Sequence, residues 1–139
     1  TACSPKTMPL RPPEIAYGRD MCDACGMLID EPQFAAAVIL EDGTARKYDD
    51  IGEMIQYHRK HPELKVKAWF VHDYDTQEWL PAETAFFVQS SQLKTPMGGG
   101  LAAFASQARA EEFAQQVSGE VMRFEVILED APAMSHGGG

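Results

Sequence analysis

The two halves of this 139-residue chain carry the same order of predicted secondary-structure elements. Each half has two apolar strands that flank a turn containing glycine, then an amphipathic helix, then a third strand. The strands are expected at 34–40, 44–48 and 66–74 in the first half, and at 85–88, 101–105 and 121–128 in the second. Three aromatic pairs keep nearly one spacing between the halves: Tyr48 and Phe104, Tyr57 and Phe113, and Trp69 and Phe124. The repeat predicts an α+β fold of two ββαβ units, with antiparallel sheets and one helix packed on each.

Capping residues and helix breakers define the two predicted helices. Asp50 can cap the first helix, with Glu53 three residues later as in a capping box, and Pro62 ends it. Ser106 can cap the second helix, which ends at Gly119.

Composition divides the chain into four segments. Residues 1–16 are rich in proline and predict an extended tether, whereas residues 132–139 end in three glycines and predict a disordered tail. The first unit is expected at 17–76 and the second at 77–131. With 12 basic and 21 acidic residues the net charge is −9, which argues against binding nucleic acid. No apolar run reaches the roughly 18 residues of a membrane helix, so we expect the folded part to be soluble. We also expect a monomer.

Four sulfur donors lie within seven positions of the first unit. They are two thiols and two thioethers, namely Met21, Cys22, Cys25 and Met27. Thiolate and thioether ligands favour monovalent copper, whereas zinc rarely takes methionine, and magnesium and calcium prefer oxygen. Gly26 can adopt the positive φ of a sharp turn, which would let Cys25 and Met27 face one centre. The stretch therefore predicts a Cu(I) site.

The Cys22–Cys25 pair is also compatible with a disulfide, a thiol–disulfide oxidoreductase centre or half of a zinc site. A structural zinc site needs four Cys or His ligands, and the sequence has no second CxxC and no histidine pair at the H-x3–5-H spacing of zinc motifs. An oxidoreductase needs its CxxC at the start of a helix, whereas a proline-rich segment precedes this one. Thr95–Pro96 does resemble the Thr-Pro pair beside redox sites, which keeps the oxidoreductase as the alternative. Because no nucleophile and base can be paired from neighbouring motifs, we expect a carrier and not an enzyme.

Met97 and His72 are the other candidate ligands. Met97 lies between a proline and three glycines in a predicted loop, where little core exists for its side chain to fill. His72 ends a predicted strand beside Asp73, whose carboxylate could orient the imidazole. Three further histidines rank lower, two at a helix end and one in the tail: His58, His61 and His136.

Cys3 remains after the CxxC pair is assigned. The sequence Thr1-Ala2-Cys3 resembles the end of a bacterial lipobox, where the cysteine becomes the lipidated first residue of the mature protein. A chance cysteine in a mobile tail is the alternative. Together with the proline-rich spacer, Cys3 predicts attachment to a membrane through a lipid anchor only.

These features together resemble the NosL family. The resemblance rests on the segment 21–27, the loop 95–98, the lipobox-like Cys3 and the doubled ββαβ order, and it extends from Cys3 to about Leu128. It implies a periplasmic lipoprotein of the outer membrane that carries Cu(I) for the copper–sulfide centre of nitrous oxide reductase, together with a membrane ABC-type maturation complex. The resemblance supports Cys25, Met27 and Met97 as ligands better than any one histidine.

Overall fold

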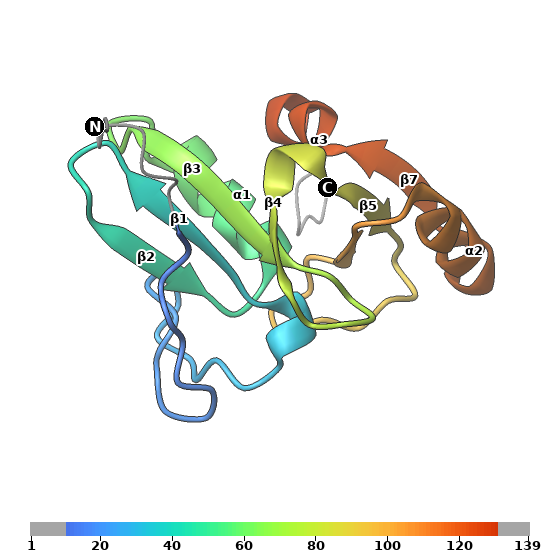
Figure 1. Cartoon of the computed structure of the whole chain (residues 1–139), viewed down its shortest axis with the longest axis horizontal. Coiled ribbons are helices and arrows are strands. Elements are labelled where there is room, and N and C mark those ends of the chain that lie inside the picture. Colours follow the sequence, from blue (N-terminus) through green and yellow to red (C-terminus); the bar gives the residue numbers. More distant parts are fainter. Residues whose placement is uncertain (1–10, 131–139) are drawn as a thin grey trace, which may run out of the picture.

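The computed structural model describes residues 11–130, which form two antiparallel sheets (Figure 1). The first sheet has four strands in the order β2-β1-β3-β4, and the second has three in the order β6-β5-β7. In both sheets the first strand of the unit lies between the second and third strands of the same unit. The predicted α+β class with two ββαβ units is therefore confirmed.

The first sheet consists of β1 (Ala36–Leu40), β2 (Ala45–Tyr48), β3 (Val66–His72) and β4 (Trp79–Pro81), and α1 (Ile51–Lys60) packs against it. The second sheet consists of β5 (Phe86–Gln89), β6 (Leu101–Phe104) and β7 (Glu120–Arg123), and α2 (Gln107–Val117) packs against it. Two 3-10 turns, η2 (Pro32–Phe34) and η3 (Ala82–Thr84), and a final helix, α3 (Phe124–Asp130), complete the order of elements. Strand β4 lies within the range expected for the second unit, but it pairs with β3 of the first sheet.

Strand pairing confirms that Tyr48 and Phe104 are equivalent in the repeat. Each pairs with the first residue of the central strand in its own sheet. Trp69 lies opposite the third residue of β1, and the corresponding place opposite the third residue of β5 belongs to Val121. The predicted match of Trp69 with Phe124 is therefore wrong.

The strand predicted at 121–128 is wrong beyond Arg123, where α3 begins. Phe124 and Ile127 are 2% and 1% exposed, whereas Val126 between them is 51% exposed. Burial three residues apart is the period of a helix face, although Phe124 and Val126, two positions apart, also fit the alternation of a strand.

Helix α3 and one short bridge join the two sheets. The ring of Phe124 lies 5.2 Å from that of Trp69 in β3 and 5.8 Å from that of Phe87 in β5, measured between centroids. Beyond β3, Tyr74 donates its N–H to the carbonyl of Ala103 in β6 at 2.7 Å. As a result, residues of both units belong to one buried cluster.

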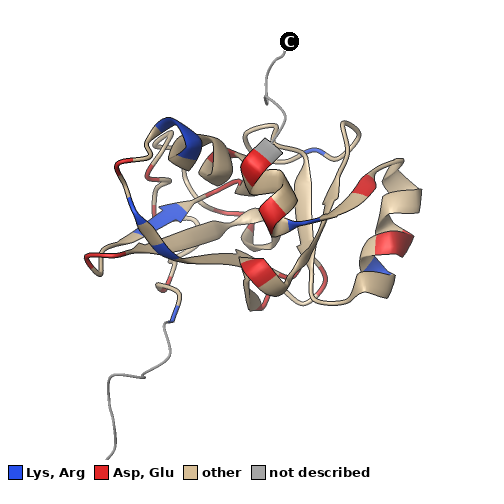
Figure 2. Cartoon of the chain, turned by 90° about the horizontal axis from the view of Figure 1, so that it is seen from above, with Lys and Arg blue, Asp and Glu red and all other residues tan. Residues whose placement is uncertain are grey.

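The N-terminal ends of α1 and α2 are capped as the sequence predicts. Asp50 accepts a hydrogen bond from the N–H of Glu53 at 3.1 Å, and Ser106 accepts one from the N–H of Arg109 at 3.2 Å. The last turn of α1 is basic, which suits the negative end of the helix dipole (Figure 2). Within residues 11–130 no helix is long and apolar enough to cross a membrane. Cys3 and the predicted tail at 132–139 lie outside the described residues.

Candidate metal centre

The CxxC motif lies in a tight loop closed by a β-bridge between Met21 and Leu28. Cys22 donates its N–H to the carbonyl of Met27 at 2.8 Å, and Gly26 donates its N–H to the carbonyl of Cys22 at 3.0 Å. Gly26 has a φ of 80°, so the positive φ predicted for it is confirmed.

Asp23 fastens this loop to the outer edge of β2. Its N–H donates to the carbonyl of Lys47 at 2.7 Å, and its carboxylate accepts the N–H of Lys47 at 2.7 Å. The Lys47 ammonium also pairs with Asp20 at 2.7 Å and holds the pKa of that carboxyl below its usual value. These contacts hold the two cysteines at the end of the first sheet where β2 leads into α1.

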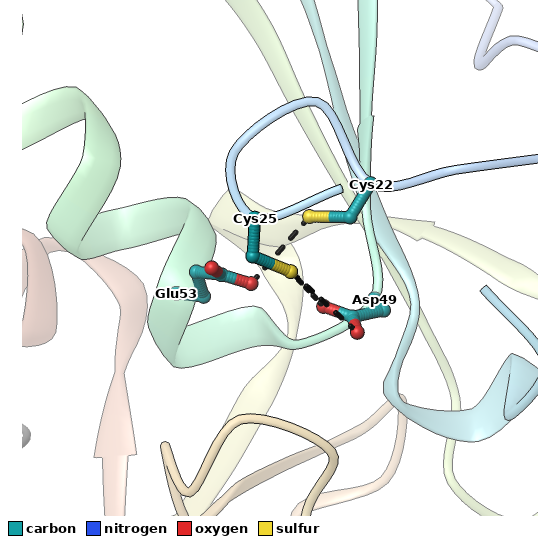
Figure 3. Close-up of side chains that lie close together, drawn as sticks. All are labelled: Cys22, Cys25, Asp49 and Glu53. Atoms are coloured by element: carbon teal, nitrogen blue, oxygen red, sulfur yellow. Dashed lines mark hydrogen bonds between the residues drawn. The ribbon is translucent and has the colours of Figure 1, made fainter. Parts of the chain in front are cut away.

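The two thiols meet two carboxylates at this end of the sheet (Figure 3). Cys22 Sγ lies 3.5 Å from Glu53 Oε1, and Cys25 Sγ lies 3.8 Å from Asp49 Oδ1. One ligand atom from each of these four residues lies within 4.8 Å of the other three. Among residues 11–130, this is the cluster of His, Cys, Asp and Glu side chains that is compact enough to hold a metal ion.

The short connection between β2 and α1 places both carboxylates. Asp49 directly follows β2, and Glu53 lies in the first turn of α1, which begins at Ile51. Glu53 was expected to complete a capping box with Asp50, but its carboxyl group faces Cys22 instead. Cys22 and Asp49 are buried, whereas Cys25 and Glu53 are half-buried, so the cluster opens to solvent on one side.

Burial disfavours the charged forms of the two thiols and of Glu53. Burial raises the pKa of the Cys22 thiol and, to a smaller extent, that of Cys25. Burial, together with the neighbouring Asp49, raises the pKa of Glu53 to about 7. Oxidoreductase CxxC motifs have lowered thiol pKa values, usually at a helix N-terminus, whereas this motif lies in a hairpin loop. The geometry therefore does not favour the oxidoreductase alternative.

A pocket of about 480 Å³ adjoins the thiol cluster. Its lining brings the CxxC loop and the 95–100 loop together: Met21, Gly26, Met27, Leu28, Asp30, Asp49, Pro96 and Met97. The three methionines are 56%, 57% and 38% exposed in chain order, which is unusual for apolar side chains. Asp49 lines the pocket and also contacts Cys25, so it connects the thiols with the thioethers.

The structure does not bring His72 to this cluster. Its Nδ1 lies 2.9 Å from the carbonyl oxygen of Ala35, and its Nε2 lies 2.8 Å from the hydroxyl of Tyr17. Because a carbonyl can only accept, Nδ1 carries the proton of the neutral ring and Tyr17 donates to Nε2. Asp73 does not orient the ring as expected, since its carboxylate accepts from Thr76 and from the N–H of Ala105. A ligand role for His72 stays a prediction without a supporting contact.

Sequence reasoning missed Asp49 and Glu53 as neighbours of the thiols. Asp49 is adjacent to the capping residue Asp50, and the capping pattern accounted for Glu53 by a local role. Their distance from Cys22 in the sequence is 27 and 31 positions, so the signal could come only from tertiary packing.

A model of the NosL family matches residues 15–132, which include the CxxC loop and both sheets. The chain belongs to the NosL family. A NosL protein from Stutzerimonas stutzeri, named as a copper-binding lipoprotein, is 30% identical over 140 aligned positions that cover 91% of this chain and 73% of the relative. The crystal structure of the copper chaperone NosL from Shewanella denitrificans matches with a TM-score of 0.76 at 24% identity, over 84% of this chain and 96% of that one. This second likeness shows that the NosL fold is shared.

Proposed function

We propose that this NosL chain binds Cu(I) and carries it to a recipient protein. The observation that carries the proposal is the meeting of two thiols with a methionine-lined pocket at one end of the first sheet. Thiolates and thioethers are soft ligands, and they select Cu(I) over the harder divalent ions. The names of the two relatives, a copper-binding lipoprotein and a copper chaperone, support the same role.

Cu(I) is the cargo of this site, and Cys22, Cys25, Met27 and Met97 are its proposed ligands. The thiols are protonated in the free protein, so binding the ion releases protons from them. Asp49 contacts Cys25 and also lines the pocket with Met27 and Met97, so it lies between the thiols and the methionines. Because Met27 and Met97 are exposed, a recipient can replace these ligands one at a time.

The ligands are tested by titrating the reduced protein with Cu(I) against a strong chelator. We expect one tightly bound equivalent, loss of tight binding in Cys25→Ser, and weaker binding in Met27→Leu, which keeps the side-chain volume. Met54→Leu is the matched control, because Met54 is a fully buried methionine of α1. Wild-type affinity in Cys25→Ser would place the copper site elsewhere.

A thiol–disulfide oxidoreductase is distinguished by a second assay on the same preparation. Its reduced CxxC would accelerate the reduction of insulin disulfides, whereas a carrier with raised thiol pKa values leaves the rate unchanged. Rapid insulin reduction without tight Cu(I) binding would favour the enzyme.

The recipient we propose is the system that assembles the copper–sulfide centre of nitrous oxide reductase, including its membrane ABC-type complex. Membership of the NosL family supports this proposal. In cells that produce nitrous oxide reductase, replacing this protein with Cys25→Ser should leave the reductase without the absorption of that centre. Full loading of the reductase in those cells would contradict the proposal.

We also propose that the protein is held at the periplasmic side of the outer membrane through Cys3. The name lipoprotein given to the Stutzerimonas stutzeri relative supports this placement. In cell fractionation, Cys3→Ala should move the protein from the membrane to the soluble periplasmic fraction with its Cu(I) affinity unchanged. A Cys3→Ala protein that stays in the membrane fraction would rule out the lipid anchor.

A further inference from the structure

Asp50 links the two units directly beside the thiol cluster. Its side chain is fully buried and accepts four hydrogen bonds. One comes from the N–H of Glu53 and caps α1 at Oδ1. The other three reach Oδ2 from the 95–100 loop: the Thr95 hydroxyl at 2.6 Å, the Met97 N–H at 2.8 Å and the Gly99 N–H at 3.3 Å.

The loop fits closely around this carboxylate. A Cβ at Gly99 would lie 2.8 Å from the Cα of Gly52 and would also clash with the Asp50 carboxylate. Thr95 also joins the two ends of the loop, because its Oγ1 accepts the N–H of Gly100 at 3.1 Å. The backbone on both sides of Met97 is therefore held to the first turn of α1.

Capping α1 does not by itself require this arrangement. In the second unit Ser106 caps α2 with a neutral hydroxyl that accepts a single backbone N–H. At the corresponding place Asp50 uses one oxygen for the cap and the other for the loop of the opposite unit. The preceding residue, Asp49, turns its carboxylate to Cys25.

From this geometry we propose that Asp50 is the positioning residue of Met97 in the copper site. Two consecutive aspartates then have different roles. Asp49 contacts Cys25, whereas Asp50 holds the backbone of Met97, so that the thioether of the second unit lies beside the thiols. The inference rests on the proposed Cu(I) function. Asp50 itself does not touch the ion and acts through Met97.

Two substitutions weaken this link to different extents. Asp50→Asn replaces one accepting oxygen by an NH₂ group that faces donors. Thr95→Val leaves the carboxylate in place and removes the 2.6 Å hydrogen bond to Asp50 together with the one that Oγ1 accepts from the Gly100 N–H. Residues that orient a metal ligand typically change affinity by about 10- to 100-fold. We expect Asp50→Asn to weaken Cu(I) binding by about that factor and Thr95→Val to weaken it less, in competition titrations with a chelator. Ser106→Ala is the matched control, since it removes the cap of α2, which accepts its hydrogen bond from Arg109 and not from the 95–100 loop, and it should leave the affinity unchanged.

A double-mutant cycle separates positioning from general destabilisation. If Asp50 acts through Met97, its substitution has no further effect on Cu(I) affinity once Met97→Leu has removed the thioether. If Asp50→Asn does not fold, the cycle of Thr95→Val with Met97→Leu tests the same prediction. The labelled methyl group of Met97 provides a second readout. The change in its NMR chemical shift on adding Cu(I) should be smaller in both variants than in the wild type.

The outcomes are distinct. An equal loss of affinity from Asp50→Asn or Thr95→Val with and without Met97 would overturn the positioning role. Wild-type affinity in Met97→Leu would overturn it as well, while leaving the cysteine part of the copper site intact. A wild-type protein that binds no Cu(I) would instead refute the proposed function.

Discussion

His58 provides a quantitative test of the fold through pH. His58 lies in α1 and is 7% exposed. Its Nε2 lies 2.7 Å from the hydroxyl of Tyr48, and its ring packs edge-on against the rings of Tyr48 and Trp69. Burial, assisted by the positive charge of Arg46, lowers the pKa of His58 to about 4. In the unfolded chain the pKa returns to about 6.5.

The sign of the effect follows from these two pKa values. Between pH 6.5 and pH 4 the unfolded chain binds a proton at His58 that the native protein does not, so the free energy of unfolding falls as the pH falls. Linkage gives a loss of about 2.5 kcal/mol between pH 7.5 and pH 4.5 from this group. Glu53 acts in the opposite direction. Its pKa is raised from 4.5 in the unfolded chain to about 7 in the native protein, so the free energy of unfolding falls as the pH rises from 4.5 to about 7. The pH curve of the wild type alone therefore does not isolate His58.

A difference between two proteins does isolate it. His58→Gln removes the titration and keeps a group that can bond to Tyr48, while Glu53 and the other ionisable groups remain common to both proteins. Urea unfolding of the metal-free proteins should show the wild type losing about 2.5 kcal/mol relative to His58→Gln between pH 7.5 and pH 4.5. A difference that stays constant with pH, or an NMR titration of His58 near 6.5, would refute the reasoning.

Three smaller predictions concern single contacts. Gly99→Ala should destabilise the protein by more than about 3 kcal/mol in urea unfolding, because the new Cβ meets the backbone of Gly52. Gly43→Ala, with a φ of 92° but open space around it, should lose only about 1–2 kcal/mol, and equal losses would contradict the close fit at Gly99. Tyr17→Phe removes the hydroxyl bonded to His72 and should lower the free energy of unfolding by about 1 kcal/mol. His72→Gln should lower stability without changing Cu(I) affinity in the chelator titration, and a weaker affinity would return His72 to the ligand set.

The repeated order of elements was predictable because it depends on local signals. Hydrophobic periodicity, a turn with Gly43 and the caps Asp50 and Ser106 each act over a few residues, and the structure confirms the elements that they predict. The positive φ of Gly26 belongs to the same class of local features.

The errors arose where local signals fitted two structures or where packing decided. The apolar residues after Arg123 fit a strand as well as a helix, and contacts of Phe124 with both sheets select the helix. Asp73 was assigned to its sequence neighbour His72, whereas its partners lie in the following turn and in the chain beyond β6. The carboxylates beside the thiols were missed for the same reason, since only tertiary packing brings them there.

The position of α3 has a consequence for the order of events during synthesis. Phe124 and Ile127 belong to the same buried cluster as Cys22 and Ile29, which the ribosome completes about a hundred residues earlier. The first sheet can pair its strands and pack against α1 as it emerges, yet the apolar side chains that contact α3 stay uncovered until α3 arrives. A nascent chain stalled before Phe124 would therefore expose Trp69 and Phe87, and chaperones that recognise apolar segments would bind it there.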